Sequence, residues 1–422
     1  MTTQSLAILG GAPVRERSWP LWPRAQQSTI AAVVDVLQST RWAVSGPYDG
    51  RTAYERRFAE AFATFEGVSY CTPTTSGTAA LTIALEALGV GRGDEVLVPA
   101  MTWVACASAV VHLGATPVLV DCDDKSLAMN AVRARERLTE RTAAILVVHP
   151  FCQTADLDAF VELANHSGTA LIEDCAQAHG ACWRGRRVGS YGSVGCFSMQ
   201  QSKLLTAGEG GCVVTDDPAL YDRAEQLRCD GRRFVDEPVV GQLELIEVGD
   251  VLGRNLCLSE IQAAILLDRL QVLDDENEWR AARARYLEEL LEGVEGVSSL
   301  PSDERVTNPT YYNFVLRFDL DQFAQCSIDV LGSALSAELG LRVNPLYAPL
   351  RDHPLLASVR GMLKSGELDH AKRARRSCLT IGHPAFLDDG QSMEDIVSAL
   401  VKVQANAACL QRQVVQPSRL SF

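Results

Sequence analysis

The chain has 422 residues, of which 47% are hydrophobic and 22% charged, and its formal net charge is −14. These proportions are ordinary for a globular protein, and the length allows two or three domains. The negative charge argues against nucleic acid or an anionic membrane as the main partner, and no uncharged apolar run reaches the ~18 residues of a membrane span.

The N-terminal stretch has no basic region followed by a long apolar core, so we expect no signal peptide. The chain carries 13 cysteines without a CxxC pair and without a Cys/His cluster at zinc spacing. Many lie in apolar runs and are expected to be small buried hydrophobes in a reducing compartment. The sequence therefore predicts a soluble, cytoplasmic protein with no metal site.

The predicted elements begin with a helix at residues 28–37. Further on, β-rich apolar runs alternate with helical patterns. The predicted strands are 95–99, 117–121, 143–149, 170–174, 194–198 and 211–215, and the helices between them are 78–88, 104–113, 131–138 and 156–166. This alternation is typical of βαβ units and of a mostly parallel sheet covered on both faces. No helical pattern lies between residues 174 and 194, so the last two strands should depart from simple βαβ winding.

A long helical pattern starts near residue 255 and leads toward a second domain. That domain is predicted to begin near residue 275, with strands at 312–318 and 342–345 and helices at 327–339 and 368–378. We therefore divide the chain into a large domain, 1–270, and a small C-terminal domain, 271–422. The tail beyond about residue 404 carries few structural signals and is expected to be mobile.

Lys203 and Asp174 carry the strongest chemical signal. Lys203 lies between a strand-like run and a glycine-rich turn in FSMQQSKLLTAGEGG, where a lysine is placed to form a Schiff base. Asp174 ends the apolar run TALIED, and packing alone explains a carboxylate poorly there. Facing a protonated pyridine nitrogen, each group would favour the charged form of the other. The pair points to a pyridoxal phosphate (PLP) enzyme.

A phosphate site is predicted where TTSGTAAL opens a helix. Thr75 or Ser76 can cap it, and Gly77 lets backbone N–H groups approach an anion. By itself this pattern is also that of an ordinary helix cap. Ser198 lies at the end of a strand, five residues before the lysine, and can donate to the same phosphate.

Four further residues have both a structural and a functional interpretation. Trp103 follows the carboxyl end of a strand and either stacks on a flat ring or packs in the core. Gln177 and His179 follow Asp174 and either contact the cofactor oxygen or shape the pocket, and for His179 a structural role is at least as plausible. Asn255 either caps the following helix or reaches the phosphate of a neighbouring subunit.

The ordered segments SGTAAL, EDCAQAHG, FSMQQSKLLTAGEGG and NLCLSEIQAA together resemble the DegT/DnrJ/EryC1/StrS family of fold type I PLP aminotransferases. The resemblance extends from about Leu6 to Leu387. It implies an α/β protein with a mixed, mostly parallel seven-stranded sheet in the large domain, a smaller C-terminal α+β domain, and a homodimer with two shared active sites.

The resemblance also implies a role for each candidate. Lys203 would be the Schiff-base lysine, Asp174 the partner of the pyridine nitrogen, and Trp103 the aromatic that stacks on the ring. Gln177 would lie by the phenolic oxygen. The phosphate would lie near Ser76, Gly77, Thr78 and Ser198, with Asn255 entering from the other subunit.

Residues around these motifs indicate a branch of the family. SMQQ before the lysine, Cys257 after the asparagine, and LGGAPVR and PLWP near the N-terminus look like the branch that acts on keto-cyclitols, which includes L-glutamine:scyllo-inosose aminotransferases. Nucleotide-sugar enzymes of the family often show FSFH instead. Cys152-Gln153, where the family usually has a glycine after an aromatic, and LTIGHPAFL depart from the common forms.

The sequence thus predicts PLP-dependent transamination of scyllo-inosose or deoxy-scyllo-inosose, with glutamine or glutamate as donor, in aminocyclitol antibiotic biosynthesis. The alternatives are a 3- or 4-keto nucleotide-sugar aminotransferase and an aminohydroxybenzoate-type synthase. Lys203 argues against a sugar 3-dehydratase, which has histidine at that position. A PLP-binding regulator or inactive partner subunit is the non-enzymatic alternative, and the complete set of site residues argues against it.

Overall fold

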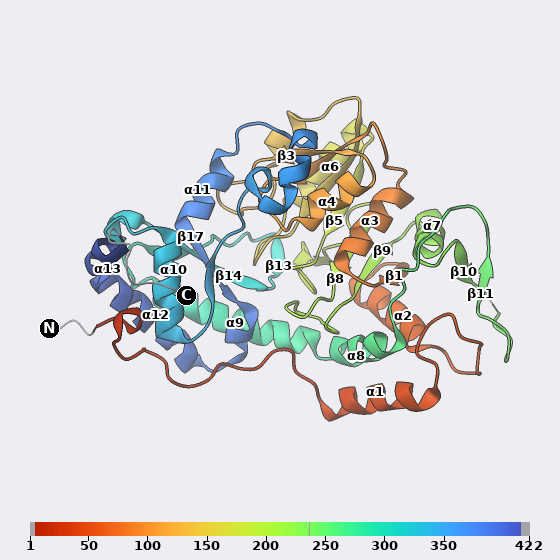
Figure 1. The fold of residues 1–422 in the computed structure, drawn as a ribbon, viewed down its shortest axis with the longest axis horizontal. Coiled ribbons are helices and arrows are strands. Elements are labelled where there is room, and N and C mark those ends of the chain that lie inside the picture. Colours follow the sequence, from red (N-terminus) through yellow and green to blue (C-terminus); the bar gives the residue numbers. More distant parts are fainter. Residues whose placement is uncertain (1–4, 236, 415–422) are drawn as a thin grey trace.

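The computed structural model describes residues 5–235 and 237–414 (Figure 1). Its centre is an eight-stranded sheet in the order β1-β9-β8-β5-β4-β2-β3-β16. The strands are β1 (Tyr70–Thr74), β2 (Glu95–Pro99), β3 (Thr116–Val120), β4 (Thr142–Val148), β5 (Ala170–Asp174), β8 (Val194–Ser198), β9 (Gly211–Thr215) and β16 (Lys364–Ser365). Only β9 runs against its neighbours, β1 and β8. The mixed, mostly parallel sheet is confirmed.

The sheet departs from the expected seven strands by one short addition. The two residues of β16 come from the C-terminal part of the chain and pair in parallel with β3. The six strands that the apolar runs predicted are all present, with ends shifted by one residue at β3 and β4. The pattern did not locate β1, whose sequence YCTPT includes a proline on an edge strand.

Helices cover both faces of the sheet because alternate residues of each strand point to opposite sides. In β4, Leu146 packs in one apolar cluster while Ile145 and Val147 pack in another. Helices α3 and α4 cover the first face, and α2, α6 and α8 (Glu260–Leu270) cover the second. The helices of this region are α1 (Gln27–Ser39), α2 (Tyr54–Glu66), α3 (Gly77–Ala87), α4 (Ala105–His112), α5 (Ala131–Arg135), α6 (Leu157–Ser167) and α7 (Pro218–Arg228).

The segment between β5 and β8 contains no helix, as predicted, but a hairpin. Its strands β6 (Cys182–Trp183) and β7 (Arg186–Arg187) pair with each other, and β6 also pairs with β13 (Val306–Asn308) from the C-terminal part. A second hairpin, β10 (Arg232–Phe234) with β11 (Leu245–Glu247), lies at the right-hand end of the molecule in Figure 1, away from the C-terminal part.

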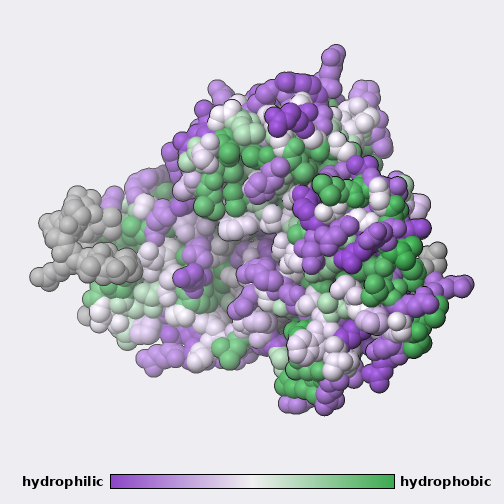
Figure 2. Space-filling view, turned by 45° about the vertical axis from the view of Figure 1, so that its right-hand side comes forward, coloured by the Kyte–Doolittle hydropathy of each residue, from purple (hydrophilic) through white to green (hydrophobic). Residues whose placement is uncertain are grey.

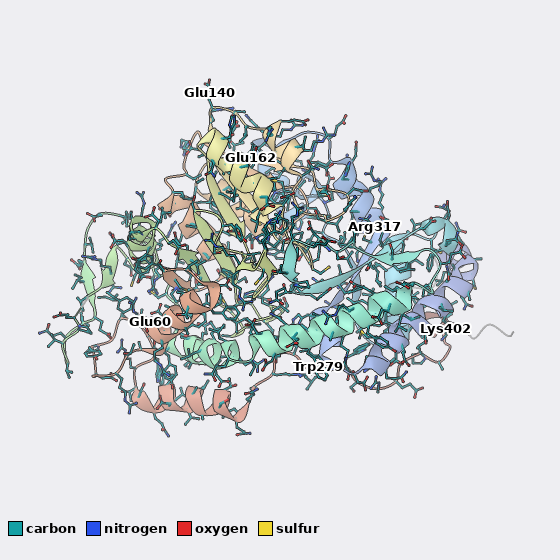
Figure 3. The ribbon with its side chains drawn as sticks, turned by 180° about the vertical axis from the view of Figure 1, so that it is seen from behind. Glu60, Glu140, Glu162, Trp279, Arg317 and Lys402 are labelled. Carbon is teal, nitrogen blue, oxygen red and sulfur yellow. The ribbon has the colours of Figure 1, made fainter. Side chains whose placement is uncertain are left out.

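The long helical pattern near residue 255 forms two helices rather than one. Helix α8 (Glu260–Leu270) starts with a capping box between Ser259 and Gln262, and α9 (Leu273–Leu291) follows after a two-residue break. Figure 3 shows α9 extending along the molecule toward the C-terminal part, with Trp279 on it.

The C-terminal part has its own antiparallel sheet in the order β12-β14-β17-β15. Its strands are β12 (Val297–Ser299), β14 (Asn313–Phe318), β15 (Val343–Pro345) and β17 (Cys378–Gly382), and its helices are α10 (Ile328–Leu339), α11 (Asp369–Ser377), α12 (Gly390–Ala405) and α13 (Ala407–Val414). The expectation of few structural signals beyond residue 404 was wrong for α13, because Ala407 and Leu410 are buried in the core of this part. Residues 415–422 lie outside the described residues.

The N-terminal segment packs on the C-terminal part. Leu6 is fully buried there, and Arg15 pairs with Asp388 at 2.8 Å. The carboxylate of Glu338 accepts hydrogen bonds from two N-terminal backbone N–H groups and pairs with Lys402 at 2.8 Å. The division at residue 270 stays a prediction, and these contacts cross it. Within the described ranges, no helix has the length and apolarity needed to cross a bilayer.

Candidate active site

The candidate residues meet at one edge of the large sheet. Strands β1, β8, β5, β4 and β2 all point the same way, so their carboxyl ends share that edge. Asp174 ends β5, Ser198 ends β8, and Ser76 follows β1. The carboxyl edge of an open α/β sheet is where ligands bind in such folds.

Asp174 is a buried carboxylate, only 6% exposed. The Cys106 thiol donates to its Oδ2 at 3.1 Å, and the Ala176 N–H donates to Oδ1 at 3.0 Å. Burial and the charge of Asp174 raise the pKa of the Cys106 thiol well above its usual value, so Cys106 stays a donor. Among the described residues no cation pairs with Asp174, and a buried carboxylate without one is costly.

Lys203 lies in a turn, Gln200–Lys203, which we call the lysine turn. Its N–H donates to the Gln200 carbonyl at 2.8 Å. The half-buried Nζ lies 4.4 Å from the ring centroid of Tyr312 on the approach to β14. No described carboxylate forms an ion pair with Lys203, which leaves this amine available to a ligand.

The start of α3 provides the predicted anion-binding surface. The Ser76 hydroxyl caps the helix by accepting from the Ala79 N–H at 3.1 Å. The N–H groups of Gly77 and Thr78, the first two helical residues, have no intrahelical carbonyl to bond. A Cβ at Gly77 would lie 2.6 Å from the Ser198 Cβ, so the helix approaches Ser198 this closely only because the residue is glycine. Thr78 is exposed.

Trp103 and Gln177 flank this region. The Trp103 side chain is 53% exposed and therefore only partly buried, and its ring lies 6.2 Å from that of Tyr347. Gln177 is buried, and its Oε1 accepts from the Phe151 N–H at 2.7 Å. Phe151 has φ +61°, in the left-handed region, and its ring stacks on Tyr347 at 5.7 Å.

Asn255 is exposed, and its side chain bonds to no described residue. The next residue, Leu256, accepts from the Thr75 N–H at 2.9 Å, which brings Asn255 to the surface beside the start of α3. It lies five residues ahead of α8, whose cap is Ser259, so the helix-cap interpretation of Asn255 is wrong.

His179 is fully buried, and neither ring nitrogen has a hydrogen-bond partner in the described chain. Burial and then the charge of Lys203 lower its pKa from 6.5 to about 3. The imidazole is therefore neutral at physiological pH and adds no second positive charge beside the lysine.

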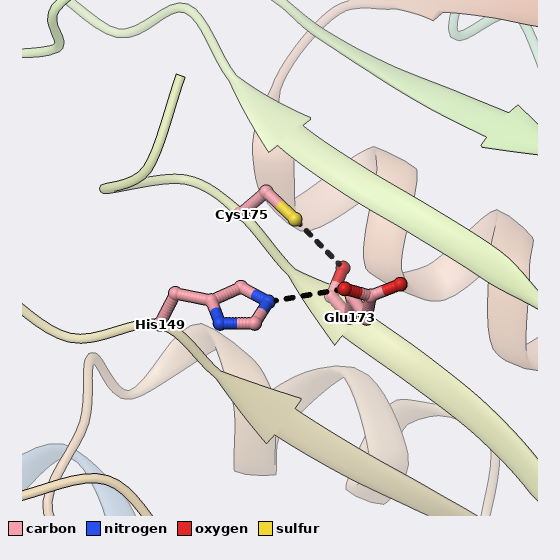
Figure 4. A group of neighbouring side chains, drawn as sticks. All are labelled: His149, Glu173 and Cys175. Atoms are coloured by element: carbon pink, nitrogen blue, oxygen red, sulfur yellow. Dashed lines mark hydrogen bonds and ion pairs between the residues drawn. The ribbon is translucent and has the colours of Figure 1, made fainter. Parts of the chain in front are cut away.

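Three buried side chains, His149, Glu173 and Cys175, lie close enough together to resemble a metal site (Figure 4). Glu173, however, accepts from the N–H groups of Gly189, Tyr191 and Gly192 at 2.7–2.8 Å and contacts His149 Nε2 at 3.2 Å. The Ala155 N–H donates to His149 Nδ1, which places the ring proton on Nε2, facing Glu173. These hydrogen bonds engage both oxygens of the Glu173 carboxylate, so the role of the cluster is to hold the loop before β8 in place.

Sequence reasoning missed several residues that surround the lysine turn and the neighbouring pocket. They come from the N-terminal segment, from α4 and from the C-terminal part, far from Lys203 in the sequence. They are Trp22, Cys106, Tyr312, Tyr347 and His383. Two sequence signals lay near them: the unusual LTIGHPAFL segment contains His383, and the PLWP segment contains Trp22.

The mostly parallel sheet, with a lysine and a carboxylate at its carboxyl edge, is typical of a class of α/β transferases. The chain matches the model of the DegT/DnrJ/EryC1/StrS aminotransferase family over residues 23–401 and belongs to that family. It is therefore an aminotransferase.

Comparison with individual proteins shows which aminotransferases this chain is similar to. The chain is 46% identical to an L-glutamine:2-deoxy-scyllo-inosose aminotransferase from Micromonospora echinospora, over 95% of this chain and 98% of that one. It is 44% identical to the L-glutamine:scyllo-inosose aminotransferase of Streptomyces griseus, with the same coverage. Among solved structures, 3-amino-5-hydroxybenzoic acid synthase superimposes with a TM-score of 0.81 at 27% identity, over 93% of this chain and 100% of that one.

Proposed function

We propose that this aminotransferase moves an amino group from glutamine to a keto-cyclitol of the scyllo-inosose or 2-deoxy-scyllo-inosose type, with PLP as cofactor, in aminocyclitol antibiotic biosynthesis. The observation that carries the proposal is the 44–46% identity to inosose aminotransferases over nearly the whole of both chains. The residues Met199, Gln200 and Gln201 before the lysine, and Cys257 after Asn255, favour the same branch.

The residues at the sheet edge fit PLP in three respects. Asp174 offers a buried negative charge that no described cation pairs with, which suits a protonated ring nitrogen. Lys203 offers an amine that forms no ion pair with a carboxylate of residues 5–235 and 237–414. The unpaired N–H groups at the start of α3 lie against Ser198 and suit a phosphate.

When bound, PLP supplies an aldehyde that takes up and returns the amino group, and a ring that accepts the electrons of the broken C–H bond. Lys203 supplies the amine for the aldehyde and carries the proton to and from the substrate carbon. Asp174 would keep the proton on the ring nitrogen, and Cys106 orients Asp174 by its hydrogen bond. Trp103 would stack on the ring, and the Gln177 amide group could donate to the phenolic oxygen because its Oε1 is already held.

We further propose a homodimer in which Asn255 enters the partner's site. On α1 the side chains of Ile30, Val34 and Leu37 lie on one helix face and are 41–49% exposed. Exposed apolar residues also occur on and near the β10–β11 hairpin, at Leu243 and Leu252. Figure 2 turns this side toward the viewer and shows hydrophobic areas among the hydrophilic ones. Exposed apolar surface of this kind marks protein interfaces.

The dimer predicts a sharp response to charge on α1. Val34→Glu should shift the protein to monomers and remove most transamination, because the shared sites would be incomplete. Val132→Glu is the matched control, since Val132 is 68% exposed on α5, away from this face. Light scattering coupled to gel filtration measures the mass. A Val34→Glu dimer with full activity would exclude α1 from the interface.

A donor–acceptor screen tests the substrates. The purified enzyme is mixed with glutamine, glutamate or alanine, and with scyllo-inosose, 2-deoxy-scyllo-inosose or 4-keto nucleotide sugars, and the products are identified by mass spectrometry. We expect glutamine to convert the cofactor to its pyridoxamine form and only the inososes to be aminated. Amination of nucleotide sugars alone would refute the cyclitol substrate.

The similarity to 3-amino-5-hydroxybenzoic acid synthase supports a second candidate, an aromatizing synthase on the same fold. At 27% identity it shows less likeness than the inosose enzymes do. Formation of an aromatic product from an amino-dehydroquinate-like substrate would favour it.

A cytoplasmic location is also proposed, since all 13 cysteines are free thiols.

A further inference from the structure

The lysine turn is held by side chains from distant parts of the chain. The indole N–H of Trp22 donates to the Gln201 carbonyl at 3.0 Å, and the His383 Nε2–H donates to the Ser202 carbonyl at 3.0 Å. The Tyr312 hydroxyl lies 3.0 Å from the Ser202 hydroxyl. The aromatic residues that contact the turn therefore come from the N-terminal segment, from the start of β14 and from the short helix after β17.

These aromatic residues also support one another. The Trp22 ring meets the His383 ring edge-on at 4.6 Å, and Tyr312 stacks on His383 at 6.1 Å. The guanidinium of Arg280 lies over Trp22 at 5.3 Å. His383 is buried, and burial together with the positive charge of Arg280 lowers its pKa well below the usual value, so it is a neutral donor to the turn.

Tyr312 is the member of this group that faces the amine itself, with its ring centroid 4.4 Å from Lys203 Nζ. An ammonium group over an aromatic face is attracted by the ring quadrupole. The contact involves no counter-charge, so it orients the side chain without holding the amine in an ion pair. Other titratable groups in this region are His179 and His383, both neutral, and the cationic Arg280, whose charge lowers the pKa values of both histidines.

We propose that Tyr312 is a positioning residue for Lys203: its ring face holds the amine beside the carboxyl edge of the sheet during the part of the cycle in which the lysine is not bonded to the cofactor. The inference rests on the proposed PLP chemistry. It adds a residue from the C-terminal part to a site otherwise built from the large sheet. Stacking on His383 supports the ring, and the Tyr312 hydroxyl makes one further contact with the Ser202 hydroxyl that the ring's position does not depend on.

The test separates bonding to Lys203 from binding of the cofactor. Apoenzyme is mixed with PLP, and the absorbance change that accompanies bond formation to the lysine gives a capture rate. Equilibrium binding of pyridoxamine phosphate, which has no aldehyde to react with the lysine, is measured in parallel. Lys203→Ala sets the baseline without capture. We expect Tyr312→Leu to capture PLP about two- to fivefold more slowly, the factor that corresponds to one ordinary cation–π contact. Its affinity for pyridoxamine phosphate should be unchanged.

Tyr312→Phe keeps the ring and serves as the second variant, which also covers a Tyr312→Leu protein that fails to fold. It should capture PLP at nearly the wild-type rate. Wild-type capture by Tyr312→Leu, slow capture by Tyr312→Phe, or an equal loss of pyridoxamine phosphate affinity would each overturn the proposal. If the wild-type protein itself fails to capture PLP, the proposed function fails and not the role of Tyr312.

Discussion

The candidate site has two halves of different origin. The sheet-edge half consists of Asp174, Ser198, Lys203 and the start of α3, all at strand ends of the large sheet. The outer wall consists of aromatic side chains from the N-terminal segment and the C-terminal part, namely Trp22, Tyr312, Tyr347 and His383. The sheet-edge half offers charges and N–H groups suited to a common cofactor. The outer wall offers ring faces and single hydrogen bonds, which can position the lysine and select the substrate.

The comparison predicts large effects at the sheet edge, and Asp174→Asn should have the largest. The neutral amide cannot hold the ring proton, and loss of one partner of a buried charge pair costs about 3–5 kcal/mol. We expect turnover to fall more than about a hundredfold. Single-turnover absorbance measures the rate with glutamine.

Glu173→Gln is the matched control, because Glu173 is the neighbouring carboxylate but serves the loop before β8. It should lower the free energy of unfolding by about 1–3 kcal/mol while the folded enzyme keeps most of its turnover. If both variants lost turnover equally with unchanged stability, the separation between a charge for the cofactor and a charge for the loop would be wrong.

The start of α3 provides the second test of the sheet edge. Gly77→Ala would place a Cβ 2.6 Å from the Ser198 Cβ, so the helix must move away from β8. Such overpacking costs about 1–3 kcal/mol, and we expect PLP affinity to fall by roughly tenfold, measured by fluorescence titration. Gly91→Ala is the control, since a Cβ there meets nothing within 4 Å. Equal affinities would place the phosphate elsewhere.

The buried side chain of His179 predicts that the free energy of unfolding depends on pH. Its pKa is about 3 in the folded protein and about 6.5 when exposed. As the pH falls below about 6.5, the unfolded chain binds a proton that the folded chain does not, so the free energy of unfolding decreases by up to about 1.4 kcal/mol per pH unit, until about pH 3.

Urea unfolding at several pH values measures this slope. His179→Gln should flatten it between pH 6.5 and 4.5, whereas His166→Gln, at an exposed position of α6, should leave it as it is. An unchanged slope in His179→Gln would mean that other buried groups, such as His383, carry the acid sensitivity.

The two halves also differ in how far the sequence predicts them. Asp174, Ser198 and Ser76 stand at the ends of local patterns, a strand or a helix start, so their position at the shared edge follows from the parallel sheet. The roles proposed for them, from their chemistry and from the family resemblance, stay predictions. Tyr312 and Trp22 contact the lysine turn across 110 and 179 residues. No local period marks such contacts.

The fold shows the same limit. The sequence predicts the βαβ alternation and the burial of both sheet faces because each strand and helix has a local hydrophobic pattern. The two residues of β16 pair with β3 across more than 240 positions and carry no pattern of their own. The break between α8 and α9 lies in an unbroken run of helix-forming residues, so it too could not be read from the period.

The smallest expected effect belongs to the outer wall. Trp22→Phe keeps a ring against His383 but removes the indole N–H that donates to the Gln201 carbonyl at 3.0 Å. One such hydrogen bond contributes about 0.5–1.5 kcal/mol, so we expect a roughly two- to tenfold change in kcat/KM for the ketone, with little change in PLP affinity. Trp279→Phe loses an equivalent bond, to the Asp388 carbonyl at 3.2 Å, and should leave both constants unchanged. A hundredfold loss in Trp22→Phe would show that the wall takes part in the chemistry as strongly as the sheet edge does, and the contrast between the two halves would no longer hold.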